Sequence, residues 1–226
     1  MRSNKRTPRI ETKDRVAWTK RGLSILIGMG AIWASLLALL LIFGDTKVAL
    51  WVNPTDAPLR SNALTMFFYI ITNSISFVIL LFVVLTIISM LYKKWQPYRK
   101  MLIGMMFSLI LTSYLTQIVK HGVGRDRPFE QLPAKIDTLG ASQPTDPSMP
   151  SGHSSSSATL AASFSLRAKG WALPTIIYVW SFLVAFSRMY LGVHYLSDVL
   201  VGYVMGTIIA FCSAHLFDRL YASGNM

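Results

Sequence analysis

Two histidines and an aspartate in the second half of the chain have the types and spacing of a nucleophile with an acid–base partner. His194 and Asp198 are four positions apart, so on a helix their side chains share one face. The carboxylate would then accept the Nδ1–H of the imidazole and leave Nε2 as an acceptor or a nucleophile. The same spacing also suits a plain hydrogen bond at a helix N-terminus. His153 supplies a second imidazole from another segment.

Three cations accompany these residues. Lys120 and Arg127 are seven positions apart in the stretch KHGVGRDRP, whose glycines and proline predict a turn that lets both side chains converge. Arg188 comes six positions before His194. Arginine binds phosphate through two parallel hydrogen bonds, and lysine adds a compact charge. Together these residues indicate a phosphate site that has a nucleophile and an acid.

The stretch PSMPSGHSSSSATLAASFSL, residues 147–166, begins with polar residues and continues as an apolar segment. One interpretation is a capped helix start, because Ser and Gly suit an N-cap and the first helical turn has spare N–H groups. The alternative is that those N–H groups bind an anion. We expect most of the serines at 154–157 to satisfy the first helical turn or to pack against neighbouring helices.

Apolar segments must position this chemistry. Of the 226 residues, 53% are hydrophobic and only 14% are charged, whereas about 25% of the residues in soluble domains are charged. The sequence therefore predicts an all-α, polytopic membrane protein with six transmembrane helices. A basic arm at 1–21 precedes the six-span domain at 22–217, and a tail at 218–226 follows it. The predicted spans are 22–43, 64–91, 101–120, 154–168, 173–189 and 197–217, of which the fourth and fifth are at the short limit.

Lysine and arginine set the expected orientation. If both termini are cytoplasmic, 15 of the 22 Lys and Arg residues fall in cytoplasmic segments, as the positive-inside rule favours. The motif loop at 120–153 is then extracytoplasmic, and all the residues above lie at the outer face, which indicates a site. This topology accounts for the net charge of +12 without a nucleic-acid partner. The single cysteine, Cys212, excludes a disulfide within one chain.

The three polar stretches together resemble the signature of the type 2 phosphatidic acid phosphatase (PAP2) superfamily of membrane phosphatases. That signature consists of Lys-x6-Arg-Pro, Pro-Ser-Gly-His and Ser-Arg-x5-His-x3-Asp. Here it takes the form of KHGVGRDRP at 120–128, PSGH at 150–153 and SRMYLGVHYLSD at 187–198. All three parts are complete, in order and correctly spaced, whereas the basic arm and the loop at 44–63 carry no part of it.

The resemblance implies catalytic roles for three residues. His194 would attack phosphorus and form a phosphohistidine, and Asp198 would orient it and stabilise the imidazolium. His153 would protonate the leaving group and then activate water. Covalent catalysis of this kind divides one difficult displacement into two easier steps.

The resemblance also implies a set of residues that bind the phosphate. Lys120, Arg127 and Arg188 would hold the phosphoryl oxygens, and the Ser151 side chain and the Gly152 N–H would assist. No metal and no other cofactor is expected, because the sequence has no carboxylate cluster of the kind that holds Mg²⁺. Arg125 and Asp126 are expected to pair with each other or to contact a head group, without a catalytic role.

The predicted function is that of an integral membrane lipid phosphatase. The substrate would be the head group of a lipid such as undecaprenyl diphosphate, phosphatidylglycerol phosphate, phosphatidic acid or a lipid A phosphate. The alternatives are a lipid phosphotransferase of the same fold and a transporter. We expect the protein in the inner (plasma) membrane with its site facing the periplasm or exterior, in contact with membrane lipids and without an obligate protein partner.

Overall fold

The computed structural model describes residues 12–53, 62–166 and 170–222. Within these ranges all the regular structure is helical, which confirms the all-α part of the predicted fold class. The elements are α1 (Thr12–Phe43), α2 (Asp45–Val52), α3 (Asn62–Leu91), the 3₁₀ turn η1 (Lys93–Trp95), α4 (Gln96–Val123), α5 (Pro128–Gln131), α6 (Gly152–Ser165), α7 (Ala172–Tyr190) and α8 (Leu196–Ala222).

Four stretches of the described chain are long and apolar enough to cross a membrane, which makes this a multi-pass membrane protein. They are Asn62–Leu91, Lys93–Gln131, Ala172–Tyr190 and Leu196–Phe217. A fifth span is present if Gly30–Phe43 and α2, which are bent by 103° to each other, are taken as one. The number of six spans, the cytoplasmic termini and the domain limits stay predictions, and the outer parts of the arm and tail, 1–11 and 223–226, lie outside the described residues.

The predicted fourth span is the helix that differs most from a membrane span. With 14 residues, α6 is about 21 Å long, which is less than the roughly 30 Å of a bilayer core. Its environment explains this, because most of its residues are buried against α4, α7 and α8. The short central helix is thus surrounded by protein, and its many small side chains suit such close helix contacts.

Glycines of α8 allow α6 to approach closely. A Cβ atom added at Gly206 would lie 2.1 Å from the carbonyl oxygen of Ser155, and one added at Gly202 would lie 2.6 Å from that of Ser151. Both distances are far below a van der Waals contact, so a larger residue at either position would push the helices apart. This contact fixes the start of α6 against the start of α8, where the second and third motifs lie.

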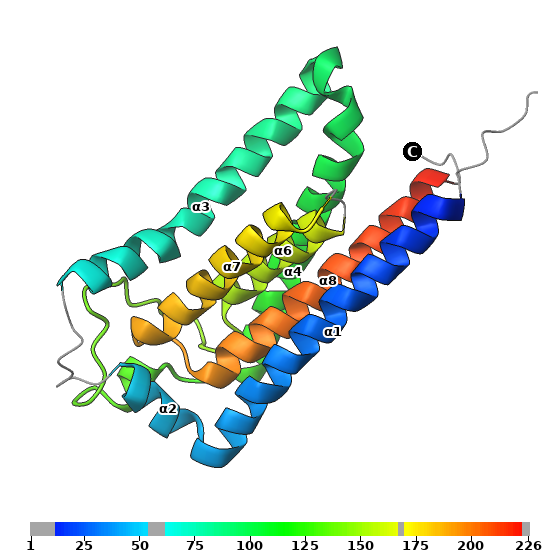
Figure 1. Cartoon of the computed structure of the whole chain (residues 1–226). Coiled ribbons are helices and arrows are strands. Elements are labelled where there is room, and N and C mark those ends of the chain that lie inside the picture. The colour runs from blue at the N-terminus through cyan, green and yellow to red at the C-terminus, as the bar shows by residue number, and fades with distance from the viewer. Residues whose placement is uncertain (1–11, 54–61, 167–169, 223–226) are drawn as a thin grey trace, which may run out of the picture.

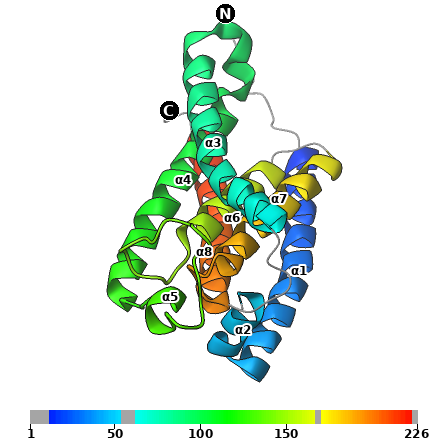
Figure 2. The same ribbon diagram turned by 90° about the vertical axis from the view of Figure 1, so that its left-hand side faces the viewer.

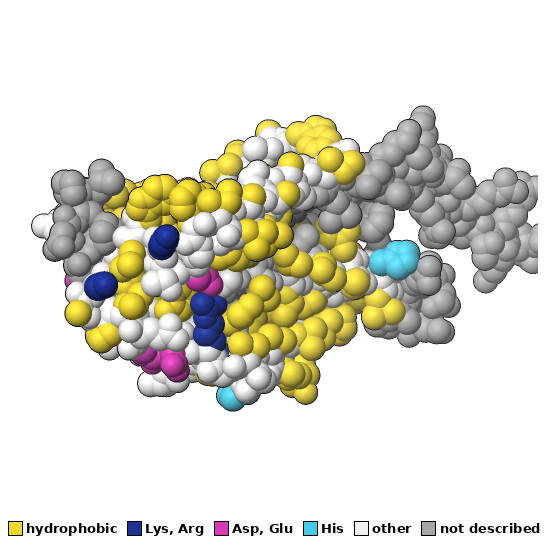
Figure 3. Space-filling model, turned by 90° about the horizontal axis from the view of Figure 1, so that it is seen from below, with side chains coloured by type: hydrophobic (Ala, Val, Ile, Leu, Met, Phe, Trp, Pro, Cys, Tyr) yellow, Lys and Arg dark blue, Asp and Glu magenta, His cyan; other side chains and the backbone are white. Residues whose placement is uncertain are grey.

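The remaining helices arrange the other motif at the same end. α3 and α4 meet at η1 and diverge towards the opposite end, as both views show (Figures 1 and 2). The last residues of α4, the short α5, the loop up to residue 151, the start of α8 and helix α2 all lie at that opposite end. Seen from below, this end has a few charged side chains on a surface that is otherwise uncharged or hydrophobic (Figure 3). The fold therefore brings all three motifs to one end of the helix bundle.

Candidate active site

His194 lies in the turn between α7 and α8 and is 3% exposed. Its Nε2 is 3.3 Å from Nη1 of Arg127, and its Nδ1 is 3.3 Å from Oγ of Ser148. Burial lowers the pKa of His194 to about 3, and the nearby guanidinium groups of Arg188 and Arg127 act in the same direction, against Asp198. The imidazole is therefore neutral at pH 7, the form that has a lone pair for attack on phosphorus.

Asp198 is fully buried beside His194, but the expected direct hydrogen bond between its carboxylate and the imidazole does not form. Its Oδ2 is 3.6 Å from Nδ1 of His194, which is longer than a hydrogen bond. Instead, Oδ2 accepts hydrogen bonds from Oγ of Ser148 at 2.5 Å and from the backbone N–H of Tyr195 at 2.8 Å. Ser148 thus lies between the two groups, and nothing in the sequence pattern singled it out.

Arg125 takes a position that the sequence did not predict. Its Nη1 donates to Oδ1 of Asp198 at 2.8 Å and its Nη2 to Oδ2 of Asp45 at 2.9 Å, whereas the neighbouring Asp126 is exposed. The expected pair of Arg125 with Asp126 is therefore wrong. Residues 124–127 have no helical structure and Arg127 is extended, and in an extended chain residues two apart point to the same side. Both arginines consequently turn inward.

Lys120 and Arg127 converge as predicted, but on a carboxylate of the protein itself. Nζ of Lys120 is 2.7 Å from Oδ2 of Asp146, and Nη2 of Arg127 is 2.8 Å from Oδ1. Burial alone would raise the pKa of Asp146, but its hydrogen bond and ion pair with Lys120, with a further contribution from Arg127, hold that pKa below its usual value. One loop carboxylate thus lies where two of the predicted phosphate-binding cations meet.

Arg188 is the third predicted phosphate-binding cation, and it is only 6% exposed. Its Nη1 donates to Oγ1 of Thr72 in α3 at 2.7 Å. Its buried Nε has no hydrogen-bond partner, and none of the described carboxylates pairs with the guanidinium. A buried cation without an anion is costly, so this side chain indicates a position for an anionic ligand.

The second motif begins α6 with a capped turn. Ser151 is the N-cap residue, and its Oγ accepts hydrogen bonds from the backbone N–H of Ser154 at 3.4 Å and from Oγ of Ser154 at 3.0 Å. Its backbone N–H donates to the carbonyl oxygen of Asp198 at 3.0 Å, which joins the second and third motifs. The capped-start interpretation is therefore confirmed. The N–H of Gly152 remains a predicted phosphate contact.

The serines after His153 behave mostly as expected. Oγ of Ser155 lies 3.0 Å from Oγ1 of Thr116 in α4, and Oγ of Ser157 accepts from Oγ of Ser181 in α7 at 3.0 Å. Both therefore join α6 to neighbouring helices. Ser156 is different, because it lines a pocket together with His153.

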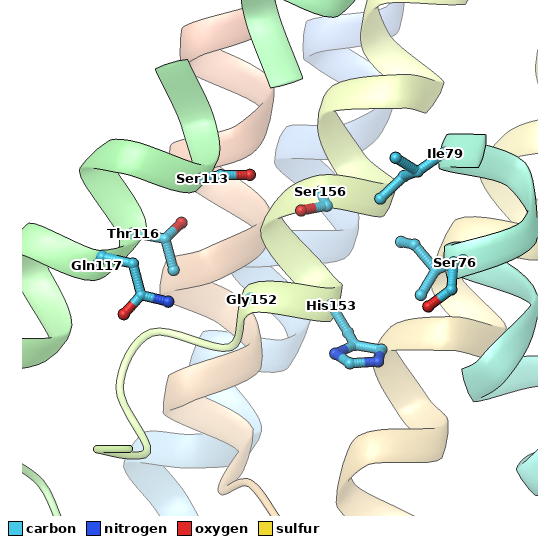
Figure 4. A pocket seen from close by; sticks show the side chains of 9 residues that line it. Ser76, Ile79, Ser113, Thr116, Gln117, Gly152, His153 and Ser156 are labelled. Carbon is cyan, nitrogen blue, oxygen red and sulfur yellow. The ribbon is translucent and has the colours of Figure 1, made fainter. Parts of the chain in front are cut away.

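That pocket has a volume of about 240 Å³ and lies between α3, α4 and α6 (Figure 4). The His153 side chain projects into the space between α6 and α3. The rest of the lining consists of Gly152, the apolar side chains of Ile75 and Ile79, and hydroxyl and amide side chains from three helices, namely Ser76, Ser113, Thr116, Gln117 and Ser156. A substrate group next to His153 would therefore meet uncharged side chains, of which some form hydrogen bonds and others are apolar.

The geometry places the predicted site residues of all three motifs around one region, and a family comparison supports this arrangement. The sequence model of the PAP2 superfamily matches residues 101–222, which is more than half of the chain. The chain belongs to the PAP2 superfamily. All three motifs fall within the matched residues, whereas α1, α2 and α3 lie before them.

Curated relatives with 30% identity or more include two enzymes named for lipid phosphates. The chain is 32% identical over 118 residues to an undecaprenyl-diphosphatase of Sulfolobus acidocaldarius, covering 52% of this chain and 56% of that protein. It is 38% identical over 93 residues to a decaprenylphosphoryl-5-phosphoribose phosphatase of Mycobacterium tuberculosis, covering 41% and 48%. The chain thus spans about half the length of the curated relatives that it matches.

Two solved structures have the same fold. Aquifex aeolicus LpxE aligns with a TM-score of 0.60 at 24% identity and covers 76% of this chain and 94% of its own. A transmembrane PAP2-type phosphatidylglycerolphosphate phosphatase from Bacillus subtilis aligns with a TM-score of 0.61 at 22% identity, covering 86% and 96%. At this identity the likeness shows the fold of a membrane PAP2 protein.

Proposed function

We propose that this protein is a metal-independent membrane lipid phosphatase that hydrolyses its substrate through a phosphohistidine at His194. The observation that carries the proposal is the buried, unpaired Nε of Arg188 in the same site as Arg127 and His194. A phosphate held by both guanidinium groups would draw the N–H of Arg127 away from Nε2 of His194 and so leave the lone pair of the neutral imidazole free to attack phosphorus. Family membership and the lipid phosphatases among the relatives support the same chemistry.

The first chemical step forms the bond between Nε2 and phosphorus and breaks the bond between phosphorus and the leaving oxygen. Burial and the neighbouring cations lower the pKa of His153, so His153 takes up its proton together with the phosphate, whose negative charge offsets those cations. It then gives this proton to the leaving oxygen, so that the lipid leaves as an alcohol or as a lipid phosphate. The cations stabilise the charge that develops on the phosphoryl oxygens. Asp198, through Ser148, holds the imidazole while it carries positive charge.

The second step restores the enzyme. His153, now neutral, takes a proton from water, and the oxygen attacks phosphorus while the bond to Nε2 breaks. Inorganic phosphate leaves and His153 is protonated again. A phosphotransferase would use the same intermediate with a lipid hydroxyl in place of water, so the two activities differ only in the acceptor of the second step.

The position of the pocket suits a lipid whose tail stays in the membrane. It lies between α3, α4 and α6, directly beside His153, and its exposed lining residues Ser76, Ser113 and Gln117 belong to helices that cross the membrane. The leaving part of the lipid would occupy it. The positive-inside distribution supports an outward-facing site in the plasma membrane. The four lipid classes named above remain the candidate substrates.

The test is release of inorganic phosphate from those four lipids in detergent micelles that contain a chelator of divalent metals. We expect wild-type protein to release phosphate from at least one of them and His194→Ala to release none above background. His215→Ala is the matched control, because His215 is an exposed histidine in the last third of α8, whereas the third motif ends at the start of that helix. Release by His194→Ala at the wild-type rate, or release only after metal is added, would contradict the proposal.

A further inference from the structure

Arg125 is held between two carboxylates, of which only one belongs to the family signature. Asp198 accepts from Nη1 and Asp45 accepts from Nη2, at 2.8 and 2.9 Å. Asp45 uses its other oxygen as well, because Oδ1 accepts the backbone N–H of Ser197 at 3.0 Å, and Oγ of Ser197 donates to Oδ2. The Asp45 carboxylate is thus fixed on the first turn of α8, one residue before Asp198.

Asp45 comes from a part of the chain that lies outside the family match. It is the first residue of α2, whereas the match begins at residue 101. The helix is fixed at both ends. Val48 and Ala49 are buried on its inner face, and beyond its last turn Nδ2 of Asn53 donates to the carbonyl oxygens of Asp137 and Tyr190 at 2.8 and 2.6 Å. Asp45 is therefore held in place by its own helix.

The position of Arg125 determines what Asp198 can do for the imidazole. A guanidinium group that is free to turn pairs with a carboxylate through two parallel hydrogen bonds, one to each oxygen. Such a pair would occupy Oδ2 of Asp198, which now accepts from Ser148 and faces Nδ1 of His194. Asp45 holds Nη2 of Arg125, so that only Nη1 reaches Asp198 and Arg125 occupies only Oδ1 of that carboxylate.

We propose that Asp45 is a positioning residue that keeps Arg125 on one oxygen of Asp198 and so leaves the other for Ser148 and His194. The inference rests on the proposed phosphatase mechanism. It assigns a catalytic consequence to α2, which none of the three motifs includes. Asp45 touches neither the phosphate nor the imidazole, so its loss should affect the reaction rate and leave substrate binding nearly unchanged.

The experiment measures kcat and KM for four forms of the full chain: wild type, Asp45→Asn, Arg125→Gln and the double variant. An asparagine keeps an oxygen acceptor for Ser197 but lacks the charge that pairs with Nη2 of Arg125, whereas the contacts of Nη1 with Asp198 and with Oγ of Ser197 do not involve Asp45. We expect Asp45→Asn to lower kcat about tenfold, which corresponds to about 1.4 kcal/mol, with KM within twofold. In the Arg125→Gln background no guanidinium is left to misplace, so adding Asp45→Asn should change kcat less than twofold.

A role of Asp45 in docking α2 alone would give a different result. In that case Asp45→Asn would lower kcat by the same factor with and without Arg125, and this outcome would overturn the proposal, as would an unchanged kcat. Asp126→Asn is the matched control, since it removes an exposed carboxylate next to Arg125 and should leave both constants unchanged. If Asp45→Asn does not fold, Asp45→Ser replaces it in all comparisons.

Failure of this proposal is distinguishable from failure of the proposed function. If wild-type protein releases phosphate and His194→Ala does not, the phosphatase mechanism stands whatever Asp45→Asn does. Asp45→Glu adds a further check, because it restores the charge on a longer side chain. It should recover part of the kcat that Asp45→Asn loses, and recovery to no more than the asparagine value would count against the role of the charge.

Discussion

Replacing Arg188 by methionine should make the protein more stable and almost inactive at the same time. Arg188 is 6% exposed. Its guanidinium donates a hydrogen bond to Thr72, but within the described residues it has no carboxylate partner and its Nε has no partner at all. In the absence of phosphate it is therefore a buried charge without compensation. Methionine carries no charge. Replacing even a paired set of buried charges by apolar residues of similar volume is often neutral or stabilises a protein by about 1–4 kcal/mol, and Arg188 has no such pair to lose.

The loss of activity follows from the same contacts. Because Nε of Arg188 has no hydrogen-bond partner among the described residues, it is available to a phosphoryl oxygen. Removing one donor to a developing oxyanion typically costs about 10²–10³ in kcat. We expect Arg188→Met to lower kcat by at least this factor and to raise the melting temperature by a few degrees, since about 1 kcal/mol corresponds to roughly 2–4 °C in a chain of this size.

Both quantities can be measured on one detergent-solubilised preparation. Phosphate release gives kcat, and intrinsic fluorescence of the six tryptophans gives the melting temperature without added ligand. Saturating inorganic phosphate should raise the melting temperature of the wild type and not that of Arg188→Met. A variant that melts below the wild type in phosphate-free buffer while retaining its activity would refute the view that Arg188 is an anion-binding residue.

Two further predictions concern the loop carboxylate and the contact between α6 and α8. Asp146→Asn should lower the melting temperature by the same amount at every pH from 5 to 8. A carboxylate whose pKa is depressed in the folded protein stabilises the fold above the usual pKa of 3.8 and loses this effect only as the pH falls below it. A difference in melting temperature that disappears between pH 8 and pH 5 would contradict this. Gly206→Ala should destabilise the protein by about 1–3 kcal/mol, since its Cβ would lie 2.1 Å from the Ser155 carbonyl oxygen. Gly30→Ala is the control and should not destabilise the protein, because an added Cβ there has no neighbour within 4 Å. Equal melting temperatures for the two variants would contradict the prediction.

The sequence predicts the helices well because long apolar segments have few alternatives in a membrane. Backbone hydrogen bonds must be satisfied within the segment, so an apolar run of sufficient length becomes a helix. Helix α6 is the exception. Its composition resembles that of a short span, but its length is set by the helices that surround it, and hydropathy does not distinguish burial in protein from burial in lipid.

The site was predictable as far as its residues belong to the three stretches with unusual spacing. Lys120 and Arg127 converge, and His194 lies beside Asp198, as the spacing indicated. Asp45 and Ser148 were missed for a physical reason. Asp45 meets Ser197 across 152 positions of the chain, and such a contact depends on tertiary packing that leaves no periodic pattern. The sequence offered one signal that Arg125 belongs to the site: it lies two residues before Arg127 in a stretch without helical structure, so both side chains can point to the same side.

The charges around the site explain how it can hold three buried cations before a substrate arrives. Lys120 and Arg127 share the single negative charge of Asp146, so the three cations and this carboxylate leave a net charge of about +2. A phosphate monoester carries about −1.5 to −2 at pH 7, which matches that remainder. Because Arg188 is the cation that Asp146 does not pair with, the incoming phosphate should bind first at Arg188. Asp146 then holds Lys120 and Arg127 in position until the phosphoryl oxygens reach them. The loop carboxylate therefore orders two of the cations without occupying the position next to Arg188, where the substrate binds.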